Sequence, residues 1–329
     1  MKKTHCFSTH MLYITTSLLM VGCEHKELCH DHPHTTQLQV VFDWAKAPDA
    51  SPKSMSLYLF PQDGGKALRY EFAGHKGGKI RVPAGHYDAL CLNSDTEGIY
   101  YRNTEKRTTF EVTTRTTALL SRLSSLGVPS QNAPRAEGTK NERVALEPDR
   151  VWSDHTENIQ LKKATNGQSL TLYPEISIQT CTIEIRNAEN LKYVSGISAS
   201  ISTMAGGMLP GIGPNALSEE RVTIPFGVAT SADKTTITGG IQSFGHCPST
   251  QNSHKLVVYT VLADGSKWYY TYDVTKQFHT APDPQHVHIL LEKLPIPKPI
   301  VDGGGFDPSV DEWEDIEVAV SYTHLRAHE

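Results

Sequence analysis

Hydrophobic and polar residues alternate along most of the chain from residue 37 onward. Residues 37–44 (QLQVVFDW) place an apolar side chain at every second position, which predicts a strand with one buried face. Similar short runs recur, and most are bounded by Gly, Pro, Asn or Asp. The further strands predicted in this way lie at residues 55–59, 79–82, 87–92, 108–112, 170–172, 176–178, 181–185, 221–226, 235–238, 257–261, 268–272 and 287–291.

The clearest turn separates the runs at 257–261 and 268–272. Asp264 and Gly265 lie between them, and Asp-Gly between two alternating runs is a strong signal for a β-hairpin. Short strands with turn residues between them are typical of β-sandwiches. A chain of 329 residues is long enough to form two domains of ordinary size. We therefore predict an all-β protein with two tandem β-sandwich domains of Greek-key type.

The composition along the chain places the expected domain boundaries. The first sandwich is expected at residues 37–165 and the second at 166–299, followed by a Gly-hinged C-terminal strand at 300–320. Residues 116–126 (TTALLSRLSSL) are the one helix expected in the first half. Residues 127–138 contain few large apolar side chains, so 127–150 are interpreted as a long exposed loop.

The N-terminus has the pattern of a lipoprotein signal peptide at residues 1–22. Two lysines precede an apolar stretch at 11–21 that is too short to span a bilayer, and the stretch ends at Gly22-Cys23. This arrangement resembles a bacterial lipobox, which implies cleavage before Cys23 and attachment of acyl chains there. An acidic residue after the lipid-bearing cysteine resembles the surface-export signals of Bacteroidota lipoproteins. We expect an outer-membrane lipoprotein, possessing a tether at 23–36; the alternative is an ordinary signal peptide with a chance cysteine.

The tether and the cysteines carry little specific chemistry. Residues 29–34 (CHDHPH) include possible metal ligands, but metal sites usually draw their ligands from rigid elements, so a solvated spacer is expected. Beyond Cys6 and Cys23, the chain has Cys29, Cys91, Cys181 and Cys247, and four cysteines allow three pairings. Cys91 and Cys181 lie within strand patterns, which favours buried free thiols.

The charge and the motifs argue against several function classes. Lys and Arg number 31 against 36 Asp and Glu, and removal of two lysines with residues 1–22 changes the net charge from −5 to −7. A nucleic-acid partner is therefore not expected. The chain has no Gly-x-Ser-x-Gly, His-Glu-x-x-His or phosphate-binding motif, and His286 and His288 have no identifiable third metal ligand. We expect a protein that is not an enzyme and that holds no metal and no cofactor.

Aromatic residues leave one alternative function open. Trp152, Trp268 and Trp313 could stack on sugar rings, which would suit a surface glycan-binding lipoprotein. Aromatic residues on a strand buried on both faces more often serve packing between strands.

Four segments together resemble a known family. They are the lipobox with the following CEHKELC, residues 55–61 (MSLYLFP), residues 81–87 (RVPAGHY), and residues 190–202 (NLKYVSGISASIS) running into 204–207 (MAGG). The chain is similar over about residues 19–320 to the fimbrillin-like and fimbrial-anchor lipoproteins of Bacteroidota, in particular to a branch without an assigned function. These motifs are turn and strand patterns and carry no chemistry.

The resemblance implies two transthyretin-like sandwiches on a lipid anchor, in a non-enzymatic subunit of a surface fimbria. Members of the family act as stalk, tip or anchor subunits that are joined by a strand passed between neighbours. Stalk subunits lose an N-terminal segment to a protease that cuts after Arg or Lys. Here Arg135, Lys140 and Arg143 lie well past the first strand. This departure favours an anchor or accessory role.

The C-terminal segment has two interpretations. Ile316, Val318 and Val320 alternate with other residues after a glycine-rich joint, which predicts one short strand that cannot fold alone. It either folds back on the second domain or is donated to a neighbouring fimbrial subunit, with its acidic residues keeping the free strand soluble. Residues 321–329 break the pattern and are interpreted as a non-native tail.

Overall fold

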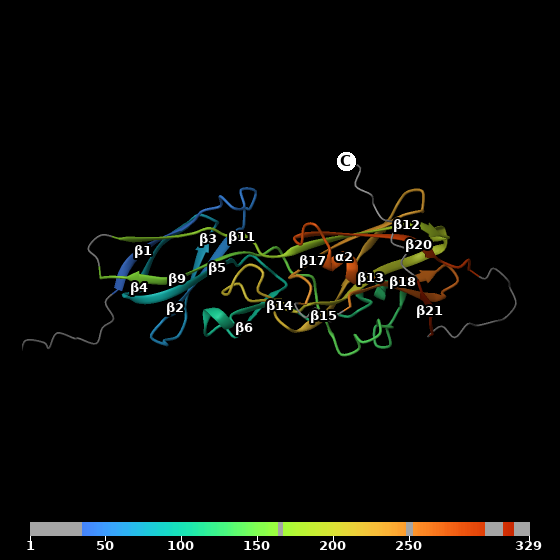
Figure 1. Ribbon diagram of the computed structural model, residues 1–329, viewed down its shortest axis with the longest axis horizontal. Coiled ribbons are helices and arrows are strands. Elements are labelled where there is room, and N and C mark those ends of the chain that lie inside the picture. Colours follow the sequence, from blue (N-terminus) through green and yellow to red (C-terminus); the bar gives the residue numbers. More distant parts are fainter. Residues whose placement is uncertain (1–34, 164–166, 248–252, 300–311, 319–329) are drawn as a thin grey trace, which may run out of the picture.

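Two β-sandwiches follow one another along the long axis of the molecule (Figure 1). The computed structural model describes residues 35–163, 167–247, 253–299 and 312–318. The predicted signal peptide, Cys23, most of the tether, Val320 and the tail at 321–329 lie outside the described residues. The predicted all-β fold with tandem sandwiches is confirmed.

The first sandwich packs a three-stranded sheet, in the order β10-β1-β4, against a five-stranded sheet, in the order β11-β9-β5-β2-β3. Its strands are β1 (Thr35–Phe42), β2 (Ser54–Pro61), β3 (Leu68–Ala73), β4 (Gly77–Pro83), β5 (Gly85–Asn93), β9 (Trp152–Leu161), β10 (Gln168–Leu172) and β11 (Glu175–Ile176). The predicted alternation in β1 is confirmed, because Leu38, Val40 and Phe42 are buried in the core between the two sheets.

The structure draws the boundary between the sandwiches differently from the sequence pattern. The expected boundary at residue 165 falls between β9 and β10, yet both strands belong to the first sandwich. β10 runs parallel to β1, with Leu38 opposite Gln168. β11, which pairs with β9, is the last strand that the chain contributes to the first sandwich.

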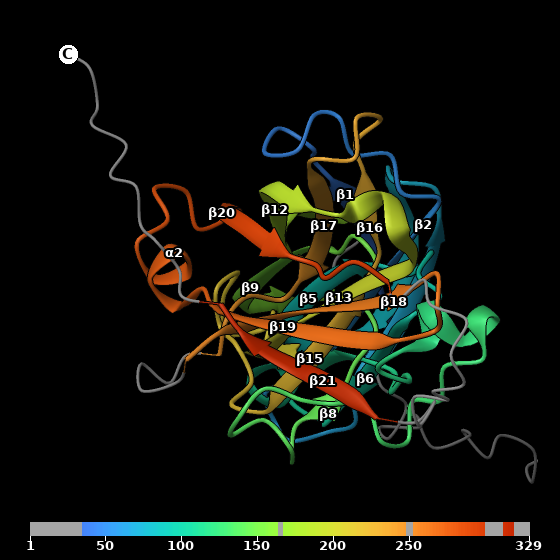
Figure 2. The same cartoon turned by 90° about the vertical axis from the view of Figure 1, so that its right-hand side faces the viewer.

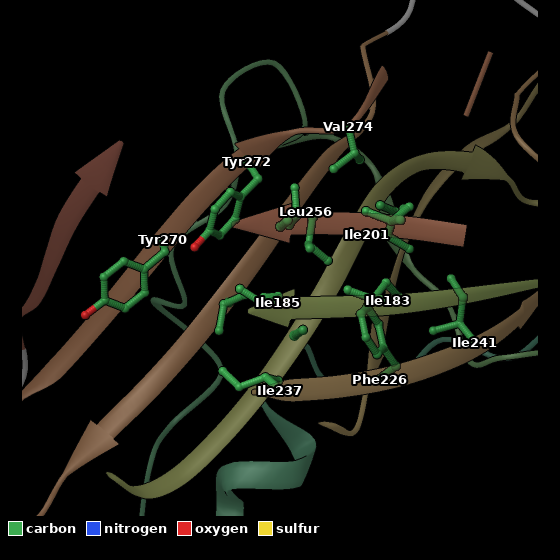
Figure 3. Close-up of a cluster of buried hydrophobic side chains, with 14 of the residues drawn as sticks. Ile183, Ile185, Ile201, Phe226, Ile237, Ile241, Leu256, Tyr270, Tyr272 and Val274 are labelled. Carbon is green, nitrogen blue, oxygen red and sulfur yellow. The ribbon is translucent and has the colours of Figure 1, made fainter. Parts of the chain in front are cut away.

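The second sandwich packs a four-stranded sheet, in the order β16-β17-β12-β20, against a six-stranded sheet, in the order β21-β19-β18-β13-β15-β8 (Figure 2). Its strands are β8 (Arg143–Val144), β12 (Gln179–Glu189), β13 (Val194–Ala205), β15 (Arg221–Phe226), β16 (Val228–Thr230), β17 (Ile237–Ser243), β18 (Lys255–Leu262), β19 (Lys267–Asp273), β20 (His286–Pro295) and β21 (Trp313–Glu317). Figure 3 shows its core, in which Ile183 and Ile185 of β12 meet Leu256 and Tyr272 of the opposite sheet.

The Asp-Gly hairpin is confirmed between β18 and β19, which pair antiparallel. Gly265 has φ +86°, a conformation that a glycine adopts without strain. The backbone N–H of Leu262 donates to the carbonyl of Ser266 at 2.9 Å, which closes the turn.

A third, three-stranded sheet in the order β14-β7-β6 lies at the middle of the molecule (Figure 1). It consists of β6 (Ile99–Arg102), β7 (Glu111–Thr114) and β14 (Gly207–Met208). Val112 of β7 and Phe110, directly before that strand, belong to one hydrophobic cluster with Tyr58 of β2 and Met208 of β14. The sheet therefore joins chain segments from both sandwiches. The short helices are η1 (Arg107–Thr109), η2 (Ser121–Leu126), η3 (Leu191–Tyr193) and α2 (Thr275–His279).

Residues 119–144, here named the outer cover, are packed on the second sandwich, which corrects the expectation of an exposed loop. Leu120 and Leu123 join a hydrophobic cluster with Val257 and Tyr259, which lie on the outer face of β18. The expected helix at 116–126 is reduced to the 3₁₀ helix η2, which ends at Gly127 with φ +74°. The outer cover therefore buries the second face of the six-stranded sheet.

Cys91, Cys181 and Cys247 are free and buried. Burial raises the pKa of the Cys181 thiol to about 12, so the thiol stays protonated and unreactive at neutral pH. Within the part of the chain that the structure describes, no helix is long and apolar enough to cross a membrane.

Candidate functional site

The C-terminal strand β21 lies at the edge of the six-stranded sheet. It runs parallel to β19, with Lys267 opposite Trp313 and Thr271 opposite Glu317. The predicted donor residues Ile316 and Val318 are half-buried and pack against the core of the second sandwich. In this structure the strand therefore folds back on its own domain.

Trp313 extends from the opposite face of β21, toward the outer cover. Its ring centroid lies 5.6 Å from that of Tyr259, with the planes at 80°. The Tyr259 hydroxyl donates to the carbonyl of Pro134 at 2.9 Å, within the outer cover. One strand thus contacts both the core and the cover of the second sandwich.

β21 is held by few interactions of its own. It pairs over five residues and on one side only, whereas β18 and β19 pair over seven. Parallel pairing is slightly less stable per residue than antiparallel pairing. Glu314 and Asp315 of the strand have exposed side chains, as has Glu312 directly before it. β21 is therefore a short strand that pairs with β19 alone and presents acidic side chains to solvent.

The outer cover holds the three basic residues that the sequence offered as protease sites. Arg135 donates from Nη1 to the carbonyls of Thr139 and Glu142, at 3.2 and 2.7 Å. Arg143 forms an ion pair with Glu220 at 2.8 Å. Of the three, Lys140 alone is exposed. Because two of these basic side chains take part in folded structure, they are poorly placed for cleavage of the native protein.

Glu142 fastens the outer cover to the second sandwich. Its carboxylate is 6% exposed and accepts hydrogen bonds from the backbone N–H of Thr203 at 3.0 Å and from the hydroxyl of Thr223 at 2.7 Å. The hydroxyl of Thr203 donates to the same carboxylate at 3.1 Å. A buried carboxylate with three donors replaces the hydration it loses on burial.

A network of charged side chains links the third sheet to the second sandwich. Arg102 of β6 contacts Glu111 and Glu220, each at 2.7 Å, and Glu220 also binds Arg143 of β8. Burial alone would raise the pKa of Glu220, but the hydrogen bonds from Arg143 and Arg102 lower it overall. Arg107, which is 9% exposed, donates to the carbonyl of Gly211 and contacts Asp88 and Glu157.

A cleft with a volume of about 900 Å³ lies between the β2–β3 turn and residues 104–108. Its floor contains Tyr58 and Phe60, which are only 5% and 6% exposed. Their rings pack against Phe110, in the hydrophobic cluster beside the third sheet. The rings of Tyr58 and Phe60 are therefore buried against other side chains and leave little aromatic surface for a ligand in this cleft.

The three tryptophans proposed for sugar stacking lie in three different places. Trp268 packs against the core of the second sandwich, and Trp313 packs under the outer cover. Trp152, at the start of β9, lines a cleft of about 360 Å³ where the two sandwiches meet. The structure therefore does not bring them together as one platform.

Histidines gather at one further place, which the sequence did not single out. The rings of His246, His254 and His279 have centroids 5.2–5.6 Å apart.

The two histidines that the sequence did single out lie on β20. His286 contacts Asp283 at 2.9 Å, and His288 Nδ1 lies 2.9 Å from the Thr182 hydroxyl. In the described part of the chain, no group of three His, Cys, Asp or Glu side chains is arranged to hold a metal ion.

A family model matches nearly two thirds of the chain. The model described as "Domain of unknown function (DUF5119)" covers residues 22–227. A protein named "Putative fimbrium anchoring subunit Fim4B", from Bacteroides ovatus, is 22% identical over 195 residues, which are 59% of this chain and 53% of that protein. The chain thus aligns with about half the length of this relative. The relationship confirms the resemblance to fimbrial-anchor proteins of Bacteroidota.

Solved structures share the fold. A crystal structure titled as a putative adhesin, from Bacteroides ovatus, superposes with a TM-score of 0.60 at 20% identity, covering 93% of this chain and 99% of that one. A protein titled as a putative polysaccharide binding protein (DUF1812), from Bacteroides thetaiotaomicron, superposes with a TM-score of 0.50 at 11% identity, covering 78% and 90%. At these identities the likeness shows the arrangement of the sandwiches.

Proposed function

Because this chain belongs to the family described as a domain of unknown function, DUF5119, and aligns with a relative named as a fimbrium anchoring subunit, we propose that it is a non-enzymatic anchor or accessory subunit of a surface fimbria. It is held in the outer membrane by lipid on Cys23, at the start of the mature chain. The relationship to the anchoring subunit is the observation that carries this proposal.

The arrangement of β21 supports a role in assembly. The strand is attached along one edge, and its departure would leave the backbone N–H and C=O groups of β19 free to pair. The side chains that it would present to another sandwich are Ile316 and Val318, which already pack against a core of this kind. In this proposal, β21 rests on its own domain until it is donated to a neighbouring subunit.

The partner interaction is tested by truncating the chain in its native host. Deletion of residues 306–320 is expected to abolish recovery of fimbrial subunits with the purified protein, as identified by mass spectrometry. Deletion of 321–329 alone is the control and should leave recovery unchanged. A thermal unfolding curve accompanies each variant. Undiminished recovery after deletion of 306–320 would contradict strand donation, and recovery of no fimbrial subunit with the intact chain would contradict the fimbrial role.

The lipid anchor is tested separately, at the cysteine. Cys23→Ala should release the protein from the membrane fraction and abolish its labelling with fatty acid. Cys29→Ala, six residues further on, is the matched control and should behave as the parent protein. Persistent membrane association and labelling of the Cys23→Ala variant would refute the anchor.

A further inference from the structure

Trp152 differs from the other tryptophans in its surroundings. Trp44, Trp268 and Trp313 each pack against one of the hydrophobic clusters, whereas Trp152 belongs to none of them. Its partner on the neighbouring strand is Ile176, which is 36% exposed. An aromatic and an aliphatic side chain that lie together outside the cores form a small apolar surface at the junction of the sandwiches.

This surface is one wall of the junction cleft, which has a volume of about 360 Å³. The first sandwich contributes residues 47–50, after β1, together with Trp152. The second contributes Gln242 of β17 and residues 285–286, at the start of β20. Ligand sites occur preferentially where domains meet, and their volumes start at roughly 300 Å³.

The position of Trp152 is fixed before any ligand arrives. Its backbone N–H donates to the side-chain oxygen of Asn93 at 2.9 Å, and Asn93 itself is 2% exposed. Trp44 meets the Trp152 ring edge-on, with centroids 6.3 Å apart at 82°. The indole N–H of Trp44 is held by the carbonyl of His75 at 2.7 Å. A ring supported in this way loses little conformational freedom on binding.

The polar residues of the lining carry no excess of one charge. Arg150 and Asp49 have opposite charges, and His286 is paired with Asp283. Gln242 and Gln285 add two amide groups. The side-chain oxygen of Gln285 is buried and accepts no hydrogen bond from the described part of the chain, which is costly unless a donor reaches it.

From these features we infer that the junction cleft binds a short neutral carbohydrate. The apolar C–H face of a sugar ring stacks on Trp152, and its hydroxyls bond to the amides of Gln242 and Gln285. The balanced charges of the lining favour a sugar without carboxylate or sulfate groups. This activity is separate from the anchor role, because it requires neither β21 nor the lipid.

The test uses the full chain in detergent and three neutral probes: maltohexaose, cellohexaose and mannohexaose. Saturation-transfer NMR and calorimetry are expected to show saturable binding of at least one probe with a dissociation constant below roughly 1 mM. Trp152→Ala should weaken that binding at least tenfold, and Gln285→Ala should weaken it measurably. Tyr173→Ala is the matched control, because Tyr173 is 44% exposed outside the cleft, and it should bind as the parent protein does.

Three results would overturn the inference. They are the absence of saturable binding for all three hexasaccharides, undiminished binding by a folded Trp152→Ala variant, and equal losses in the Tyr173→Ala control. Thermal unfolding of each variant shows whether it is folded. If Trp152→Ala does not fold, Ile176→Ser changes the same wall of the cleft at an exposed position and takes its place, with the same tenfold loss expected.

Discussion

The ring of Trp313 on β21 meets the ring of Tyr259 on β18 edge-on, with centroids 5.6 Å apart. Tyr259 is 1% exposed and lies between the six-stranded sheet and the outer cover. The C-terminal strand is thus coupled to the cover through one aromatic pair. Release of the strand removes this contact as well as its backbone pairing with β19.

Truncating Trp313 should loosen the strand. Trp313→Ala is expected to lower the free energy of unfolding by about 2 kcal/mol, because the side chain is half-buried, whereas loss of a fully buried aromatic costs roughly 3–5 kcal/mol. Urea unfolding followed by circular dichroism measures the change. Glu314→Ala, an exposed position on the same strand, is the control and should change the free energy by less than about 0.5 kcal/mol.

Locking β21 to β19 should separate a donated strand from a permanent one. Tyr269 and Asp315 are direct partners in the register, so the double variant Tyr269→Cys/Asp315→Cys should form a disulfide across the two strands. The oxidised protein should remain folded but recover no fimbrial subunits, and reductant should restore recovery. If oxidised and reduced proteins recover subunits equally, β21 is not the donor.

Removing the Glu142 carboxylate should detach the outer cover. Glu142→Ala leaves the N–H of Thr203 and the hydroxyl of Thr223 without their acceptor, which is expected to cost about 2–4 kcal/mol. Limited trypsin digestion should then cut within the cover, at Arg135 or Lys140, at least tenfold faster than in the parent protein. Glu137→Ala, an exposed position in the same cover, is the control. Equal digestion rates for the two variants would show that Glu142 does not hold the cover.

Acid should destabilise the second sandwich through His254. This side chain is fully buried, its Nδ1 lies 3.3 Å from the carbonyl of Ser202, and its Nε2 has no hydrogen-bond partner among the residues that the structure describes. Burial lowers its pKa to about 4, and the nearby His246 and His279 act in the same direction, while Asp273 opposes them. The unfolded chain therefore binds more protons than the folded one between pH 6.5 and 4.

Stability should consequently be complete above about pH 6.5 and fall as the pH is lowered toward 4, with a loss of about 3 kcal/mol from this group. Urea midpoints measured across this range give the slope. His254→Gln should flatten the slope, and His288→Gln, at an exposed position, should leave it unchanged. An identical slope in the His254→Gln variant would exclude His254 as its source.

Strand positions could be predicted where the alternation was clear, because the two-residue period is a local property of the chain. β9 does not follow this pattern, since WSDHTENIQL is mostly polar and its burial does not alternate. It is a strand because it pairs with β5 along its length. The loop expected at 127–150 differs for the opposite reason. Its few apolar side chains, Val128, Ala136 and Val144, join the cluster on the outer face of β18. The continuous apolar run at 256–259 was the available signal for a strand buried on both faces.

The candidate sites, too, depend on which side chains the fold brings together. The sequence does not distinguish Trp152, Trp268 and Trp313. The fold places Trp152 in a cleft, whereas the other two pack against hydrophobic clusters. The histidine group was invisible in the sequence, because His246, His254 and His279 come from separate segments that meet through the fold.

The alternating pattern and the turn residues were enough to predict the fold class and the hairpin at Asp264-Gly265. They did not predict that β10 completes the first sandwich, that the outer cover packs on β18, or that the C-terminal strand comprises Trp313–Glu317 and lies parallel to β19. The physical reason is that alternation reports which side of a strand is apolar, whereas burial of apolar surface is not directional. Which apolar surface each strand meets is fixed by pairing between residues far apart in the chain, such as Leu38 with Gln168.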